Sequence, residues 1–239
     1  MPHRYMNMQD VAALLGMDQR RVERMAQRGQ IPCQKVGGRY RFNRAEITEW
    51  LQQHLPSLDS VNLADMDAGI TAQRQVSPDA ALVSSMVRTE AISCHLPART
   101  KNSVLKELVE LVQKTGLLYD GPALLEALCQ REELCSTALE GGIAIPHPRR
   151  PLPYAVAEPL LAFARTSKGI GFGAPDGRLT DLFFMICCPD DRHHLHVLAR
   201  LCRLLHDDGF CSALRHVDEP PEVIRLIRDR EIQVLAEAI

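Results

Sequence analysis

Apolar residues recur at helical spacing in two short segments near the N-terminus. The first segment, residues 8–16, ends at Gly16, and the second begins after Asp18, a residue type that caps helices. Two short helices joined by a tight, glycine-containing turn are typical of a helix-turn-helix. The outward positions of the second helix are polar and mostly basic: Gln19, Arg20, Arg21, Arg24, Gln27 and Arg28.

Two short strands are predicted next, separated by Gly37–Gly38, a dipeptide that favours a tight hairpin turn. A third helix then begins after Asn43 and ends near Leu55. Arginine, lysine and glutamine are the side chains that contact phosphates and base edges in DNA. We therefore expect a DNA-binding surface made of Gln19, Arg20, Arg21, Arg24, Arg28, Lys35, Arg39 and Arg41. The alternatives are a solvated basic helix and a module that docks onto another protein.

The rest of the chain divides into a linker and an α/β region. Residues 56–86 contain two prolines, are rich in Ser, Asp and Ala, and show little periodicity, so they predict a linker with one short helix near Asp79 to Met86. Strands and helices alternate from residue 87 onward, which predicts an α/β fold, a mixed sheet with flanking helices. The expected strands are 89–96, 142–146, 160–166 and 179–188, and the expected helices are 96–116, 121–134, 190–210 and 221–239. The expected domains are 1–55, 56–86 as linker, and 87–239.

Length and composition agree with this division. The 239 residues suit two domains, and 46% apolar with 24% charged residues is ordinary for a soluble globular protein. The chain shows neither a membrane-span pattern nor a secretory leader, so we expect a cytoplasmic protein. Residues 1–54 carry nine Lys or Arg and five Asp or Glu, whereas the remainder carries 19 and 25, which favours nucleic acid as the partner of the N-terminal part. The eight cysteines lack CxxC spacing and predict reduced, mostly buried thiols.

The stretch from Arg131 to Arg150 is the best candidate for chemistry. It passes from an Arg-Glu pair through Ser-Thr and two glycines into a short apolar strand, and it presents His147 directly after Pro146. An imidazole beside backbone N–H groups and guanidinium groups suits a phosphoryl acceptor. Ser136–Thr137 is interpreted as a structural turn, because no third group marks a catalytic triad.

Residues 8–55 resemble the excisionase-type, MerR-like winged helix family. The features that carry the resemblance are the basic helix ending in Arg-Gly-x-Ile-Pro, the segment K-V-G-G-R-x-R-F, and the final helix with Trp50. The resemblance implies DNA binding.

Residues 87–230 resemble the type-2 enzyme IIA domains of the phosphoenolpyruvate-dependent phosphotransferase system, most closely the nitrogen-regulatory branch, with fructose and mannitol IIA as relatives. The match rests on Arg131-Glu132, Ser136-Thr137 and Gly142 to His147, and on H-L-x-x-L-x-x-L from His194 to Leu201. The resemblance implies that His147 is phosphorylated, that His194 is the second active-site histidine and that Arg131 pairs with the phosphate. We expect Thr137 and Arg149 to stabilise the phosphate as well.

Three positions depart from the family pattern. Ala138 and Glu140 stand where the family has glycine, and a glutamate near the site would repel phosphate. Pro148 follows the histidine, which removes one N–H. We expect no cofactor and no metal, because His193, His194 and His196 diverge around a helix and do not converge on one ion.

The interpretation is a cytoplasmic transcription regulator that is phosphorylated on His147 by a histidine phosphocarrier of the HPr type and binds DNA. The alternatives are a phosphohistidine relay protein without a DNA role and a IIA-like module that binds a partner without being phosphorylated. Regulated protein targets are further expected partners. Paired DNA sites favour a homodimer.

Overall fold

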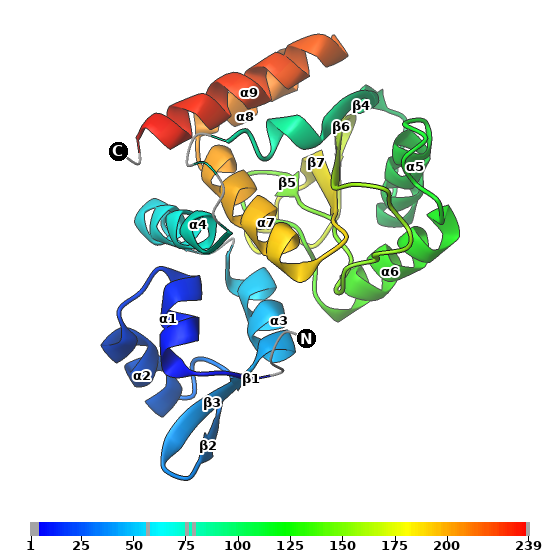
Figure 1. The fold of residues 1–239 in the computed structure, drawn as a ribbon. Coiled ribbons are helices and arrows are strands. Elements are labelled where there is room, and N and C mark those ends of the chain that lie inside the picture. The colour runs from blue at the N-terminus through cyan, green and yellow to red at the C-terminus, as the bar shows by residue number, and fades with distance from the viewer. Residues whose placement is uncertain (1–4, 56–57, 75–76, 78–79, 238–239) are drawn as a thin grey trace. The chain divides into compact units, whose positions relative to one another are not determined.

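The computed structural model describes residues 5–55, 58–74, 77 and 80–237 (Figure 1). The chain forms two compact units. The first contains residues 1–80, 195–206 and 234–239, and the second contains residues 81–194 and 207–233. Among the described residues, no helix is both long and apolar enough to cross a membrane.

The N-terminal helices follow the predicted pattern. Helix α1 is Met8–Leu15, α2 is Gln19–Gln27 and α3 is Arg44–His54. Gly16 ends α1 with a φ of 61°, and the Asp18 side chain caps α2 by accepting the N–H of Arg21 at 2.9 Å. The predicted caps are confirmed, including Asn43, whose side chain accepts the N–H of Ala45. The apolar faces of these three helices, together with Phe42, form a small core. Its buried residues include Val11, Leu15, Val22, Phe42, Ile47 and Leu51.

A three-stranded antiparallel sheet accompanies these helices, in the order β1-β3-β2. Strands β2, Gln34–Val36, and β3, Arg39–Asn43, form the predicted hairpin. Gly37 and Gly38 have φ values of 57° and 78°, a conformation that two-residue hairpin turns require and that glycine adopts without strain. Strand β1, Tyr5–Met6, was not predicted; its two residues pair with the far edge of β3.

The linker contains a helix that the sequence analysis did not predict. Helix α4 is Ser60–Arg74, and it packs against α1 in the first unit. The buried positions of α4 recur at helical spacing but include polar residues: Leu63, Met66, Asp67, Ile70 and Thr71. The sequence analysis expected one short helix in this linker, and α4 is a second, longer one. The expected short helix corresponds to a single turn, Ser84–Met86; Asp79, its expected first residue, lies outside the described residues.

The second unit contains a four-stranded mixed sheet, as predicted. Its strands are β4, Val87–Leu96, β5, Ile143–Ala144, β6, Leu160–Ile170, and β7, Thr180–Cys187. The order is β4-β6-β7-β5, with β4 parallel to β6, β6 antiparallel to β7 and β5 parallel to β7. The central strands β6 and β7 are buried along most of their length, which explains their long apolar runs.

Helices α5, Lys101–Gln113, and α6, Gly121–Leu134, lie side by side next to the sheet (Figure 1). Their apolar faces share one core with the strands, including Val104, Leu108, Leu124, Leu128, Ala162 and Phe183. Helix α9 is Pro220–Ala236. All eight cysteines are free, and five are buried, in agreement with the prediction.

The predicted helix 190–210 is two helices. Helix α7 is Asp191–Leu205, and α8 is Asp208–His216. Asp207 separates them, because its side chain accepts the N–H of Phe210 at 3.0 Å and so caps a new helix. Helix α7 belongs to both units, since the boundary falls between His194 and Leu195.

Candidate functional site

His147 is the third residue after the short strand β5 and is 3% exposed. The two residues before it are fixed by backbone hydrogen bonds, because the Ile145 N–H donates to the Thr137 carbonyl and the Ile186 N–H donates to the Pro146 carbonyl, each at 3.0 Å. The ring atom Nδ1 lies 2.7 Å from the Ile145 carbonyl oxygen. A carbonyl can only accept, so Nδ1 carries the proton and the lone pair is on Nε2.

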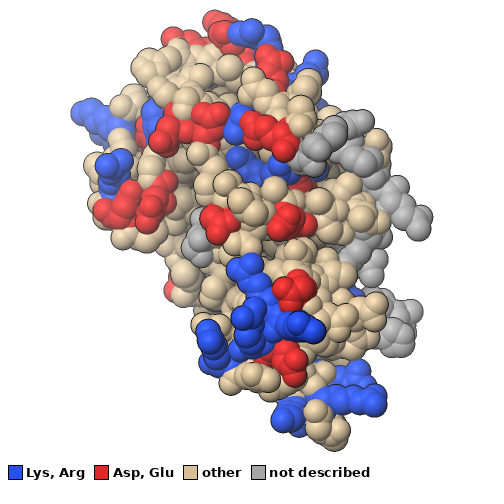
Figure 2. Space-filling model, turned by 90° about the vertical axis from the view of Figure 1, so that its left-hand side faces the viewer, with Lys and Arg blue, Asp and Glu red and all other residues tan. Residues whose placement is uncertain are grey.

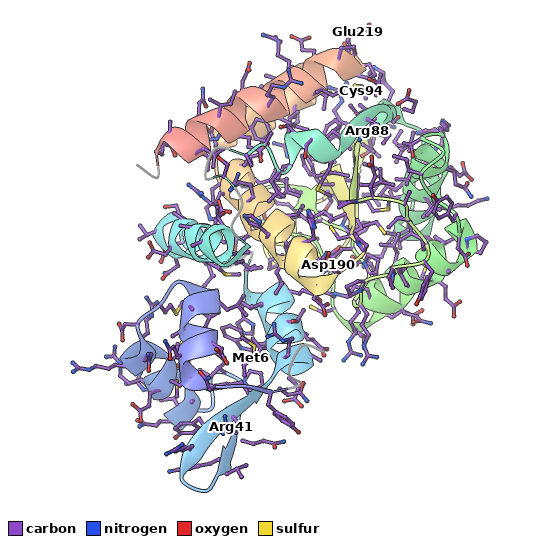
Figure 3. The ribbon with its side chains drawn as sticks, viewed as in Figure 1. Met6, Arg41, Arg88, Cys94, Asp190 and Glu219 are labelled. Carbon is purple, nitrogen blue, oxygen red and sulfur yellow. The ribbon has the colours of Figure 1, made fainter. Side chains whose placement is uncertain are left out.

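His194 faces His147 from the first turn of α7. The two ring centroids are 5.0 Å apart, with the ring planes inclined by 45°. Asp190, labelled in Figure 3 just before α7, accepts the N–H of His193 at 2.9 Å and starts the helix. Neither Nε2 atom of the two site histidines has a hydrogen-bond partner among the described residues. The predicted histidine pair is thus brought together, with two unpaired ring nitrogens.

Both site histidines are neutral near pH 7. Burial lowers the pKa of His147 well below its usual value, and the nearby His194 and Arg131 lower it further, against the Ile145 hydrogen bond. Burial and the Arg131 charge lower the pKa of His194 to about 4. A neutral imidazole with a free lone pair is the nucleophilic form.

Arg131 supplies the positive charge of this site. It lies near the C-terminal end of α6, is 4% exposed, and donates from Nη1 to the Cys135 carbonyl at 2.7 Å. Its charge acts on both histidines. A guanidinium group fixed in a buried site is suited to bind an anion through charge-assisted hydrogen bonds.

Glu132 holds the segment that links α6 to β5, a role that the sequence analysis did not assign. Its Oε1 accepts the N–H of Thr137 at 3.0 Å and also the Thr137 hydroxyl, while Oε2 pairs with Lys101 Nζ at 3.0 Å. Only its place in the sequence, directly after Arg131 in the Arg-Glu pair, could have pointed to this role. The hydroxyl proton of Thr137 is therefore engaged with Glu132, and the phosphate-stabilising role of Thr137 stays a prediction.

The three departures from the family pattern have different surroundings. Ala138 pairs with Ala144 across an isolated antiparallel bridge. The positive φ values fall on Gly141 and Gly142, at 80° and 81°, and Glu140 is exposed. Pro148 is buried, whereas Arg149 is exposed, so its predicted contact with phosphate stays a prediction.

The three histidines of α7 have separate surroundings. His193 lies 3.6 Å from Asp190, His194 faces His147, and His196 lies 3.1 Å from the Asp67 carboxylate. Among the described residues, no group of three or more His, Cys, Asp or Glu side chains could hold a metal ion.

The predicted DNA-binding residues lie on α2 and on the hairpin. Figure 2 shows a cluster of Lys and Arg side chains over this module, with a few acidic ones between them. All eight are exposed: Gln19, Arg20, Arg21, Arg24, Arg28, Lys35, Arg39 and Arg41. Arg41 is labelled on the hairpin in Figure 3. Arg21 differs from the others, because its Nη1 donates to the Asn62 side-chain oxygen of α4 at 3.0 Å.

Comparison with known protein families assigns both regions. Residues 85–230 match the family described as "Phosphoenolpyruvate-dependent sugar phosphotransferase system, EIIA 2", and residues 5–55 match "Helix-turn-helix domain". Residues 60–74, which form α4, lie between the two matched regions.

Individual relatives support the match of residues 85–230. The chain is 37% identical over 129 residues to the "PTS system fructose-specific EIIA component" of Haloferax volcanii, covering 53% of this chain and 82% of that protein. It is also 37% identical over 137 residues to a "Nitrogen regulatory protein" of Bradyrhizobium diazoefficiens, covering 56% and 86%. The crystal structure of nitrogen regulatory protein IIA-Ntr from Neisseria meningitidis superposes with a TM-score of 0.56 at 28% identity, covering 62% of this chain and 99% of that one.

Proposed function

Because the chain belongs to the phosphoenolpyruvate-dependent sugar phosphotransferase system EIIA 2 family and carries a helix-turn-helix domain ahead of that region, we propose that it is a regulatory protein that accepts a phosphoryl group on His147 and binds DNA. The donor is a histidine phosphocarrier of the HPr type. The observation that carries the phosphorylation is the buried Nε2 atom of His147, which is without a proton and without a partner among the described residues.

The transfer needs little more than positioning and charge. The Nε2 lone pair of His147 attacks the phosphorus of the donor's phosphohistidine, and a new N–P bond forms as the donor's N–P bond breaks. The donor imidazole leaves with the electron pair of that bond. Arg131 and His194 lie beside the incoming group, where a guanidinium and an imidazole N–H can bind phosphate oxygens.

His194 changes its role as the charge arrives. It is neutral while the site is empty, because burial and Arg131 lower its pKa to about 4. A phosphate carries roughly −1.5 to −2 charges at pH 7, and that charge raises the pKa of a neighbouring imidazole. His194 then takes up a proton and donates it toward the phosphate, so that the new charge is partly neutralised.

The output is transcriptional in this proposal. Relatives of the C-terminal region include a nitrogen regulatory protein, and the N-terminal region supplies an exposed basic helix and hairpin that suit the DNA backbone and grooves. A homodimer would place two such modules on paired half-sites.

A labelling experiment tests the phosphorylation. The protein is incubated with radiolabelled phosphoenolpyruvate, enzyme I and an HPr-type carrier, and the label is checked for the acid lability of a phosphohistidine. We expect full labelling of the wild type and of His216→Ala, which removes an exposed histidine from α8, and none of His147→Ala. An unlabelled wild type favours the partner-binding module instead. Labelling without DNA binding favours the relay protein.

A further inference from the structure

Asp67 is a buried carboxylate that neither family match accounts for. It lies in α4, outside both residues 5–55 and residues 85–230, and it is 1% exposed. Its Oδ2 accepts from Arg200 Nε and from Arg203 Nη1, each at 2.5 Å, and its Oδ1 lies 3.1 Å from His196 Nε2. A buried charge is costly unless it is paired, so this cluster fixes α4 on the part of α7 that lies in the same unit.

Thr71 strengthens this attachment one helical turn further along α4. Its hydroxyl donates to the Asp67 carbonyl at 2.8 Å and lies 2.9 Å from His196 Nε2. Since the single hydroxyl proton is used by the carbonyl, the Thr71 oxygen accepts from His196, and Nε2 of His196 carries a proton. The same proton faces the Asp67 carboxylate.

The helix that Asp67 holds is also the helix that supplies His194. His196, Arg200 and Arg203 are spaced by four and three residues and so share one side of α7. His194 precedes them by two residues, roughly 200° around the helix, and faces His147. One continuous helix therefore bears the second site histidine and the three side chains that contact the Asp67 carboxylate among the described residues.

The other side of α4 contacts the helix-turn-helix. At Gly69 an added Cβ would lie 2.8 Å from the Ala13 carbonyl oxygen, so α4 and α1 approach closely at this point. Asn62 accepts from Arg21 of α2, and it is itself held by Asp59, which accepts the Asn62 N–H at 2.8 Å and its side-chain amide at 2.7 Å. The Nη1 donor that Asn62 engages is not available to a DNA phosphate, and the contact holds the Arg21 side chain toward α4.

We propose that α4 carries the state of the His147 site to the helix-turn-helix, with Asp67 as the positioning residue. The inference rests on the proposed function. Phosphate on His147 draws His194 and the first turn of α7 toward the new charge. That movement disturbs the geometry at Arg200 and Arg203, which are 2% and 8% exposed and have little room to follow. Helix α4 then loosens, Asn62 releases Arg21, and the Nη1 donor of Arg21 becomes free to turn toward a DNA phosphate.

The test compares full-length wild type with Asp67→Asn, an isosteric change that removes the charge, and with Asp65→Asn, an exposed control on the same helix. DNA affinity and hydrogen exchange of residues 60–74 are measured with and without phosphorylation. We expect phosphorylation to tighten DNA binding at least about fivefold in wild type and Asp65→Asn, with faster exchange in α4. In Asp67→Asn the difference falls below about twofold, while labelling of His147 is unchanged.

Several outcomes overturn the proposal. The proposal is wrong if phosphorylated wild type binds DNA no more tightly than unphosphorylated wild type. It is also wrong if phosphorylation still tightens DNA binding to the same extent in Asp67→Asn. If Asp67→Asn does not fold, Thr71→Val replaces it, because this change removes only the hydroxyl contacts with His196 and the Asp67 carbonyl.

A measurement that needs neither phosphate nor DNA separates this inference from the proposed function. Exchange in α4 is compared in a double-mutant cycle of His194→Gln and Asp67→Asn. We expect His194→Gln to change α4 exchange at least about threefold only when Asp67 is present. Equal effects in both backgrounds overturn the coupling. An unlabelled wild type overturns the proposed function alone.

Discussion

Gly16 lies so close to Asp65 that a Cβ atom on the glycine would be 2.3 Å from the Asp65 carbonyl oxygen. Gly16 ends α1, and Asp65 lies in α4, so the first helix of the helix-turn-helix and the linker helix meet backbone to backbone. Close packing of this kind leaves no room to shift. Helix α4 is therefore part of the packed first unit, and substitutions at the contact have large effects.

Gly16→Ala should destabilise the first unit more than Gly29→Ala. Both glycines have positive φ, 61° and 66°, so both substitutions carry the cost of a left-handed residue, about 1–2 kcal/mol. Only at position 16 does the new methyl group meet backbone, because nothing lies within 4 Å of a Cβ at Gly29. We expect a loss of about 3 kcal/mol or more for Gly16→Ala, measured by chemical denaturation. Equal losses would refute the close contact.

Glu132→Gln should slow phosphorylation of His147. The charge of Glu132 pairs with Lys101, and its Oε1 holds both polar groups of Thr137 in the segment that precedes the site strand. The glutamine removes the ion pair with Lys101 and leaves a weaker, neutral acceptor for Thr137, which should lower the free energy of unfolding by about 1–3 kcal/mol and the rate of labelling by roughly tenfold. Glu133→Gln, a change at the next, exposed position of α6, is the control and should match wild type. A Glu132→Gln protein with the wild-type labelling rate contradicts the positioning role.

Acid should destabilise the protein through its site histidines. In the unfolded chain His194 takes up a proton as the pH falls below about 6.5, whereas in the folded chain its pKa is lowered to about 4. The unfolded state binds more protons between these values, so the free energy of unfolding decreases as the pH falls, by up to ~1.4 kcal/mol per pH unit for this group. His194→Gln removes this contribution, and its stability between pH 6 and pH 5 should therefore decline less steeply. His216→Gln, at an exposed position, should keep the wild-type slope; identical slopes in all three proteins would show that His194 does not contribute.

The paired change Arg20→Ala and Arg24→Ala should weaken DNA binding at every sequence tested. Both residues are exposed on α2 and suit phosphate contacts. Loss of two such contacts should weaken binding roughly tenfold or more and reduce the slope of affinity against salt by about two. Arg225→Ala with Arg228→Ala, on exposed positions of α9, changes the net charge equally and is the control. If both double variants weaken binding alike, net charge and not the α2 surface is responsible.

Most elements were predictable because local patterns agreed with the final packing. Gly16, Asp18 and Asn43 mark helix ends by their side chains alone, and the long apolar runs of β6 and β7 reflect burial on both faces. The position of His147 just after a short apolar strand was also predictable, because the strand and the histidine are neighbours in the sequence. His194 is 47 residues further along the sequence, and no local pattern links it to His147. Its place beside His147 was predicted only from the resemblance to the IIA family.

Helix α4 was missed for a physical reason. Asp67 and Thr71 occupy two of the five buried positions whose burial is described in α4, so the apolar stripe that identifies an amphipathic helix is narrow. These residues are buried because their partners are Arg200, Arg203 and His196, more than 120 residues away in the sequence. Hydrophobic periodicity carries no information about such pairs. The same limit hid Glu132, whose role depends on the folded position of Lys101.

The attachment of α4 to α7 also decides where this protein can be divided. The region matched to the EIIA 2 family ends at residue 230 and begins at residue 85. Arg203 has two polar partners outside that range, Asp67 and the Val234 carbonyl, and Arg200 loses the same carboxylate. A fragment cut at the family limits would lack these partners of Arg200 and Arg203, which are 2% and 8% exposed in the folded chain. We therefore expect a fragment of this chain to be more stable when it includes the linker helix and the last turns of α9 than when it is cut at residues 85 and 230.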